Sequence, residues 1–209
     1  DQQAATIGQG CLGFGETKAT YGTGAFALTN MGQAIPRSDH RLLGTVLYQQ
    51  DGVRTYAIEG SCFVAGSLVQ YLRDQLGLIG SAAETEELAR SIEDSGEVVI
   101  VPALAGLGAP HWKPDARGVI SGLSFASGRA QIARAEDGRA PAPEDARAAL
   151  EAMAHQTHDL ASAFAADGAP WCRLNIDGGM SVNDWMAQDL ANILDLPVER
   201  PDFVETTAL

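Results

Sequence analysis

The first residue of the chain, Asp1, carries a carboxylate that could accept the proton of a hydroxyl group, and Gln2 and Gln3 follow it. A carboxylate in this role is the general base of phosphoryl transfer, where it takes the proton from the attacking oxygen. By composition alone, an aspartate at the start of a chain is far more often a solvated charge. The chemistry therefore depends on whether other segments offer a phosphate site.

A short glycine-rich segment, Tyr21-Gly22-Thr23-Gly24, lies between two runs of strand-forming residues. Glycines let backbone N–H groups approach an anion closely, and the threonine hydroxyl adds a donor. Taken alone, most segments of this kind are simple hairpin turns. Gly22 and Thr23 are nevertheless candidates for contacting a phosphate.

Two further glycine positions could lie against a flat ring. Gly66 and Gln70 are four residues apart, so on a helix they share a face, and it is not the apolar stripe of that segment. Asp177-Gly178-Gly179 falls between a strand pattern and a helix pattern, where glycines permit a close approach to a nucleotide. Asn183 is expected on the same side as Gly179. The alternatives are a helix–helix contact at Gly66 with a solvated Gln70, and an ordinary strand–helix turn at Gly179.

A loop of unusual regularity, Gly106-Leu107-Gly108-Ala109-Pro110-His111-Trp112, precedes Asp115-Ala116-Arg117-Gly118. It is too organised for a filler loop. Its simplest interpretation is partial burial of His111 and Trp112, with a local ion pair between Asp115 and Arg117.

An alternation of strands and helices must position these segments. Glycine-punctuated runs of β-formers predict strands in the first sixty residues, with a tight hairpin turn at Asp51-Gly52. Apolar residues then recur at helical spacing, and helices alternate with short strands. This order predicts an α/β domain with a mixed sheet flanked by helices. The expected strands are 25–30, 42–49, 53–59, 97–101, 173–176 and one beginning in 197–200; the expected helices are 62–76, 81–92, 142–166 and 181–194.

The composition restricts the classes of function. The formal net charge of −13 opposes nucleic acid as a partner, so a nucleotide site must rest on local backbone dipoles and Mg²⁺. Cys11, Cys62 and Cys172 lack metal-ligand spacing, so neither a zinc site nor a disulfide framework is indicated, and a reducing cytoplasm fits best. A run of about 18 apolar residues, as a membrane span needs, does not occur.

Taken together, the motifs resemble the FGGY family of carbohydrate kinases, and most closely its glycerol-phosphorylating members. They occur in the order and at the spacing of the family, and the resemblance covers nearly the whole chain. Five collinear motifs are much more specific than any one of them. They are Asp1-Gln2-Gln3-Ala4-Ala5, Tyr21-Gly22-Thr23-Gly24-Ala25-Phe26, Tyr56-Ala57-Ile58-Glu59-Gly60 running into Gly66-Ser67-Leu68-Val69-Gln70, Gly106-Leu107-Gly108-Ala109-Pro110-His111-Trp112, and Asp177-Gly178-Gly179.

The resemblance implies an actin-like ATPase (ribonuclease H-like) fold, with ATP and Mg²⁺ as cofactors. Asp1 matches the catalytic base of the family and lies in its substrate site, while Gln2 matches a residue that touches the polyol. Phe26 matches an aromatic residue that packs on the carbon face of glycerol. The nucleotide positions matched are Gly22 and Thr23 in the phosphate-binding hairpin and Gly66, Gln70, Gly179 and Asn183 around the adenosine; no metal ligand is matched.

The expected function is ATP-dependent phosphorylation of a polyol hydroxyl, with conversion of glycerol to glycerol 3-phosphate preferred because of Phe26 and the 106–112 segment. Xylulose, ribulose or gluconate are alternative substrates. A nucleotide-binding module that is inactive by itself is a different class of function, and a non-catalytic relative is a third, against which the retained Asp1 counts. The implied partners are a small-molecule polyol and ATP, within a cytoplasmic homo-oligomer.

The chain also departs from the pattern of the family. The resemblance implies that residues 1–209 are an incomplete C-terminal nucleotide-binding domain, without the N-terminal substrate domain and the final helices. We therefore expect no turnover from the 209-residue chain alone in a coupled ADP-release assay. Residues 136–148 interrupt a helix of the family, and Gly138, Pro141 and Pro143 oppose its continuation. A tolerated surface loop is favoured there over a regulatory or partner-binding element.

Overall fold

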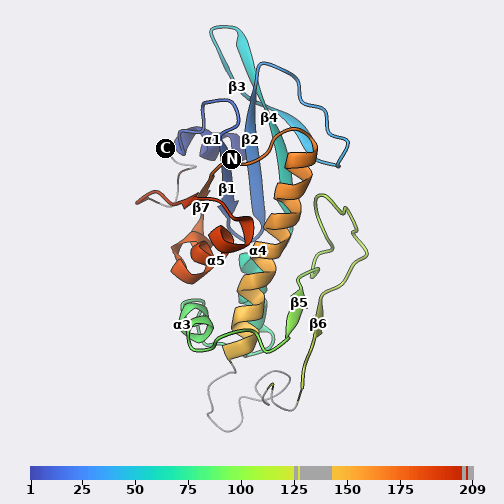
Figure 1. Ribbon diagram of the computed structural model, residues 1–209, viewed down its shortest axis with the longest axis vertical. Coiled ribbons are helices and arrows are strands. Elements are labelled where there is room, and N and C mark those ends of the chain that lie inside the picture. Colours follow the sequence, from blue (N-terminus) through green and yellow to red (C-terminus); the bar gives the residue numbers. More distant parts are fainter. Residues whose placement is uncertain (125–126, 128–142, 204–205, 207–209) are drawn as a thin grey trace.

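A mixed sheet forms the centre of the computed structural model, which describes residues 1–124, 127, 143–203 and 206 (Figure 1). The six strands of the sheet lie in the order β3-β4-β2-β1-β7-β8. The strands β3, β4, β2 and β1 pair antiparallel, whereas β7 pairs parallel to β1 and β8 parallel to β7. The predicted α/β class with a mixed sheet is confirmed. The strands are β1 Thr17–Tyr21, β2 Ala25–Gly32, β3 Leu43–Gln50, β4 Val53–Cys62, β7 Leu174–Asp177 and β8 Val198–Glu199.

A long helix, α4 (Pro143–Ala166), runs along one face of this sheet (Figure 1). Helices α3 (Glu84–Arg90) and α5 (Asp184–Leu194) pack against it, and a separate two-stranded ribbon of β5 (Val99–Val101) and β6 (Val119–Ser121) lies on its other side. The patterns predicted α3, α4, α5 and β5 but not β6. The segment 136–148 was expected to interrupt a helix of the family. Its residues 136–142 lie outside the described part of the chain, and α4 begins at Pro143.

The two faces of the sheet carry different chemistry because successive residues of a strand point to opposite sides. The Tyr21 hydroxyl lies 2.8 Å from the Thr157 hydroxyl of α4, so Tyr21 belongs to the helix-covered face. Its neighbours Lys18 and Thr20 therefore face the other side. There a short helix that the patterns did not predict, α1 (Gln2–Gly8), meets Lys18 through Gln2.

Helix α2 (Gly66–Asp74) is shorter than the predicted 62–76 segment. The reason is tertiary, because β4 continues to Cys62, which pairs with Ala25 of β2. The turn between β3 and β4 matches its prediction, since Asp51 and Gly52 both have the positive φ (51° and 81°) that a tight hairpin requires. None of the helices in the described ranges is both long and apolar enough to cross a bilayer.

The predicted helix at 181–194 begins later than expected. Gly179–Val182 forms a 3₁₀ turn, Asn183 is extended (φ −77°, ψ 107°), and α5 starts only at Asp184. Asn183 Oδ1 accepts the N–H of Met186 at 2.9 Å, so Asn183 is the N-cap of α5. An N-cap has non-helical backbone angles, so the four-residue spacing between Gly179 and Asn183 does not by itself place them on the same side.

The loop before β3 is tied to the end of α4 by one carboxylate. Asp167 accepts hydrogen bonds from the Ser38 hydroxyl and the Asp39 N–H, and one of its oxygens lies 2.7 Å from His40 Nδ1. Burial raises the pKa of Asp167, but these hydrogen bonds outweigh burial and leave the pKa below its usual value. A carboxyl whose pKa is depressed on folding stabilises the fold above its unfolded pKa, and the effect is lost as the pH falls through its folded pKa.

Replacing this carboxylate, Asp167→Asn, is expected to lower the free energy of unfolding by about 1–3 kcal/mol at neutral pH, the cost of weakened bonds to partly buried donors. The difference from the wild type should stay constant down to about pH 5 and shrink below about pH 3.9, where the wild-type aspartate gains a proton. Urea titrations of both proteins across that range measure it. A difference that grows as the pH falls would contradict the assignment.

Candidate nucleotide and substrate site

The hairpin between β1 and β2 is fastened to the start of helix α2. The carbonyl of Gly22 accepts the N–H of Gly66 at 2.9 Å, and the carbonyl of Thr23 accepts those of Ala65 and Ser67 at 2.9 and 3.1 Å. The Ser67 hydroxyl also donates to the Thr23 carbonyl, at 2.9 Å. The N–H groups at the start of a helix have no partner within the helix, and here the hairpin supplies one. This helix end therefore holds the hairpin instead of presenting its N–H groups to an anion.

The β1–β2 hairpin, the start of α2 and the segment after β7 meet at a junction, and two glycines are required for their close approach. A Cβ on Gly66 would lie 2.6 Å from the Gly22 carbonyl oxygen and 3.0 Å from Met180 Cγ. A Cβ on Gly178 would lie 2.6 Å from the Tyr21 carbonyl oxygen, and the φ of Gly178 is +87°. The hairpin, the start of α2 and the segment after β7 thus meet at one place. A close contact at Gly66 does exist, but it is made with the hairpin carbonyl of Gly22 and the Met180 side chain, so the alternative of a contact between two α-helices is wrong.

Two other glycines at the junction leave bare backbone facing open space. A Cβ added to Gly22 or Gly179 would meet no atom within 4 Å. The N–H of Gly22 is already bonded to the Gly24 carbonyl at 2.9 Å, so Gly22 offers room and not a donor. Among the described residues, no partner is recorded for the N–H or the hydroxyl of the exposed Thr23. Thr23 is therefore the donor of the hairpin, and Gly22 and Gly179 give a ligand space to approach.

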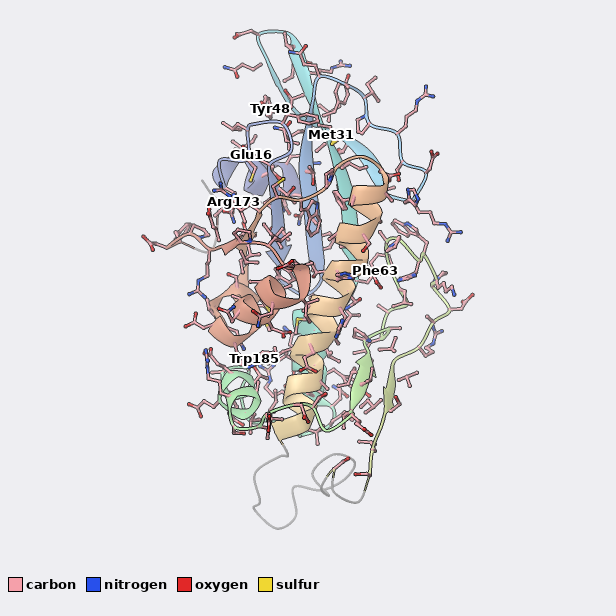
Figure 2. All side chains as sticks on the ribbon, viewed as in Figure 1. Glu16, Met31, Tyr48, Phe63, Arg173 and Trp185 are labelled. Atoms are coloured by element: carbon pink, nitrogen blue, oxygen red, sulfur yellow. The ribbon has the colours of Figure 1, made fainter. Side chains whose placement is uncertain are left out.

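A cavity of about 410 Å³ opens beside Thr23 and runs along the exposed side of α2. Phe63, labelled in Figure 2, forms part of its wall and packs edge-on against Trp112, with ring centroids 5.9 Å apart. Gln70 lies one helical turn beyond Gly66 and is exposed at the cavity. Apolar walls with a few polar groups are typical of small-molecule sites. The structure thus brings Thr23 and Gln70 to one cavity that begins at the junction.

Asn183 stands apart from these residues in its bonding. Its side chain is buried, caps α5, and donates to Thr85 Oγ1 at 3.2 Å. Both ends of the amide are thus engaged within the protein. The matched role of Asn183 beside adenosine stays a prediction.

The residues predicted to contact the polyol substrate lie on the face of the sheet that α4 does not cover. Asp1 is exposed, precedes α1, and accepts the Ala5 N–H at its carbonyl, at 2.9 Å. Gln2 Oε1 accepts a hydrogen bond from Lys18 Nζ. Phe26 of β2 is directly opposite Thr20 of β1 in the antiparallel register. Gln2 and Phe26 are therefore connected through β1, the strand that leads into the hairpin.

Lys18, which belongs to none of the sequence motifs, is fully buried and links these residues. Its ammonium donates to Gln2 and, at 2.8 Å, to the hydroxyl of Thr20. A charged residue inside the short strand 17–21 was the available signal, because lysine is almost never fully buried without a partner. Burial lowers the pKa of Lys18 to about 8, although the charges of Asp177 and Glu59 oppose that shift.

The 106–112 loop packs against the end of β4. The N–H of Ala109 donates to the Ser61 carbonyl at 2.9 Å, and Trp112 Nε1 donates to the Arg41 carbonyl at 2.7 Å. The simple interpretation of an ion pair between Asp115 and Arg117 is wrong, because Arg117 donates to the carbonyls of residues 114 and 116 instead. Backbone acceptors lie within reach of the guanidinium in this turn and take its donors.

Comparison with known sequences agrees with this geometry. Residues 17–209 match the FGGY family of carbohydrate kinases, C-terminal domain. The glycerol kinase of Rhodospirillum centenum is 53% identical over 209 residues, all of this chain and 39% of that protein. The glycerol kinase of Rhizobium meliloti is 51% identical over 215 residues, again all of this chain and 40% of that protein. The chain thus spans about two fifths of the length of these relatives.

Comparison with solved structures gives the same family. The structure of Plasmodium falciparum glycerol kinase with ADP aligns with a TM-score of 0.86 at 33% identity, covering all of this chain and 39% of that one. A xylulose kinase from Lactobacillus acidophilus aligns with a TM-score of 0.78 at 22% identity, covering 98% of this chain and 38% of that one, which supports the fold alone. With the hairpin, the glycine junction and the mixed sheet in place, the chain belongs to the FGGY family of carbohydrate kinases and has their actin-like ATPase fold.

Proposed function

We propose that this chain is the C-terminal nucleotide-binding domain of an ATP-dependent polyol kinase, with glycerol as the acceptor. The observation that carries the proposal is the junction at which Gly22 and Gly179 leave open backbone beside the unpartnered donors of Thr23. The similarity to glycerol kinases along the whole chain supports glycerol over xylulose, ribulose or gluconate. The N-terminal domain of the family would supply the remaining acceptor contacts, and action in the cytoplasm as a homo-oligomer is part of the same proposal.

In the proposed reaction, one set of residues contacts the nucleotide and another contacts the polyol. The N–H and hydroxyl of Thr23 donate to the phosphate chain of the nucleotide, while Gly66, Gln70 and Gly179 border the space for the adenosine. Asp1 accepts the proton of the acceptor hydroxyl as that oxygen attacks phosphorus. Gln2 and Phe26 hold the polyol, the first by a hydrogen bond and the second by packing on its carbons. Positioning and charge stabilisation supply most of the rate in this class of reaction.

Mg²⁺ bound with the nucleotide would neutralise charge on its phosphates. Among the residues that the structure describes, no group of three His, Cys, Asp or Glu side chains could hold a metal ion. Mg²⁺ usually retains several waters and binds through substrate phosphates with only one or two carboxylates. The site thus fits Mg²⁺ that arrives with the nucleotide, and not a dedicated metal cage.

Two measurements test the proposal. Calorimetry on the chain should show ADP binding, which Thr23→Val weakens by about tenfold to 100-fold because a charge-assisted hydrogen bond contributes about 1.5–3 kcal/mol. The chain joined to an FGGY N-terminal domain should then phosphorylate glycerol faster than xylulose, ribulose or gluconate in an ADP-release assay. ADP binding without turnover would favour the nucleotide-binding module, and no ADP binding would refute both functions.

A further inference from the structure

Lys18 is an unusual residue in this fold. The chain contains two lysines, Lys18 and Lys113; the side chain of Lys18 is fully buried, whereas Lys113 is exposed. The hydrogen-bond partners of Lys18, Gln2 Oε1 and Thr20 Oγ1, are neutral. Within the described part of the chain, Lys18 forms no ion pair within 4 Å. A buried ammonium is thus held by two uncharged oxygens.

This arrangement is a poor way to stabilise a fold. Burial of a charge costs several kcal/mol unless it is closely paired, and apolar residues of similar volume are often neutral or stabilising replacements. A methionine at this position would fill the same space. The cost calls for a role of Lys18 other than packing.

The partners of Lys18 indicate that role. Gln2 is in the first turn of α1, directly after Asp1, and it lies on the sheet face that also carries Thr20 and Phe26. Thr20 is opposite Phe26 and directly precedes Tyr21, the last residue of β1 before the hairpin turn. One ammonium therefore joins the start of α1 to β1, the strand that pairs with Phe26 of β2 and leads into the hairpin that carries Thr23.

We propose that Lys18 is a positioning residue that fixes Gln2, and with it Asp1, against strand β1 for attack on the nucleotide. This inference rests on the proposed kinase function and deepens it. Because Lys18 is fully buried, it cannot touch a substrate, and it acts through Gln2 and Thr20. A displacement of about 1 Å at a reacting group can cost about 100-fold in rate. A residue that holds the base in place can therefore have a large effect on the rate.

The charges around Lys18 determine how stability should respond to its loss. Burial lowers its pKa to about 8, while Asp177 of β7, Glu59 of β4 and, weakly, the Cys11 thiol act to raise it. A lysine with a lowered folded pKa destabilises the fold below that pKa, and this cost fades as the pH rises towards its unfolded pKa of about 10.4. At neutral pH, Lys18→Met should therefore leave thermal stability unchanged or raise it. A lysine retained only for structure would give the opposite result.

The anchoring can be measured on the chain itself, by amide hydrogen exchange in Lys18→Met, with Lys113→Met as the matched control on the only other lysine. We expect the Ala5 N–H and the other amides of α1 to exchange about tenfold faster in Lys18→Met, while the β1–β2 ladder and α4 stay protected. Lys113→Met should leave α1 unchanged. Equal protection of α1 in both variants would overturn the anchoring.

The catalytic consequence is measured on the chain joined to an FGGY N-terminal domain. Lys18→Met should lower kcat for glycerol by about 10- to 100-fold, with KM for ATP within about twofold, because only the acceptor side loses alignment. In a Gln2→Ala background the same change should lower kcat by less than about twofold, because residues that act as a unit are not additive.

Each result decides one of the two ideas. An undiminished kcat in Lys18→Met, or an equal loss in the Gln2→Ala background, refutes positioning through Gln2. Absence of turnover in the unmodified protein refutes the kinase function and, with it, the catalytic role of Lys18. The exchange experiment still decides whether Lys18 anchors α1.

Discussion

The Asp1→Asn variant of the chain, joined to an FGGY N-terminal domain, is expected to lose about 10²- to 10⁴-fold in kcat, the usual contribution of a general base. Asparagine cannot accept the proton of the attacking hydroxyl as a carboxylate does. Steady-state kinetics with glycerol and saturating ATP measure the loss. The KM for ATP should hardly change, because the proposed nucleotide contacts lie at the hairpin and along α2, and not at Asp1.

The asparagine substitution is well matched to the local structure. Asp1 precedes α1 in the N-cap position, its side chain makes no capping hydrogen bond, and only its carbonyl bonds to Ala5. Aspartate and asparagine are about equally good at that position, so α1 should be retained. Circular dichroism and ADP affinity equal to the wild type would confirm this. More than a tenth of the wild-type kcat in Asp1→Asn would rule out Asp1 as the base.

The two adjacent glycines after β7 should respond in opposite ways to the same added methyl group. Gly178→Ala places a Cβ 2.6 to 3.0 Å from three backbone atoms of Tyr21, at a φ of +87°. Neither backbone can yield without opening the junction, so we expect a loss of about 3 kcal/mol or more in stability. Gly179→Ala meets no atom within 4 Å and should change stability by less than about 1 kcal/mol. It should nevertheless weaken ADP binding about tenfold or more, since the methyl fills space left for the nucleotide.

Thermal unfolding and ADP calorimetry on both variants separate structure from binding. Gly22→Ala, whose Cβ is also unobstructed, repeats the Gly179→Ala test on the hairpin. Should Gly179→Ala bind ADP as well as the wild type, the nucleotide does not pass close to this backbone. A Gly178→Ala protein as stable as the wild type would mean that β1 and β7 do not approach as closely as the structure shows.

Much of the fold was accessible from local patterns. The turn at Asp51-Gly52, the strand ending at Asp177 and the long helix α4 each follow from signals within a few residues. That Gly22, Gly66 and Gly179 lie around one nucleotide was implied by the family resemblance alone, since no single segment predicts its neighbours in space. The contacts that close the junction, such as the Gly22 carbonyl on Gly66, involve backbone atoms that every residue has.

The elements that escaped prediction depend on tertiary contacts. Helix α1 has seven residues, too few to show an apolar stripe, and β6 pairs only with β5 through exposed residues. Asn183 fitted a helical position by counting, but its capping bond to Met186 delays the helix. Lys18 carried a detectable signal, a charge within a strand, whose meaning depends on which face of the sheet it occupies.

The bonding of the hairpin carbonyls to helix α2 has a consequence for how the enzyme could move. Thr23, the proposed phosphate donor, and Gln70, about one turn along α2 from Gly66, are attached to the same hydrogen-bonded unit, so the span between them is constant. Under the proposed function, this unit would set a fixed distance along the nucleotide, and β1, whose Lys18 holds Gln2, leads directly into it. Any shortening of the path between ATP and the acceptor during turnover is therefore expected to come from groups outside this sheet.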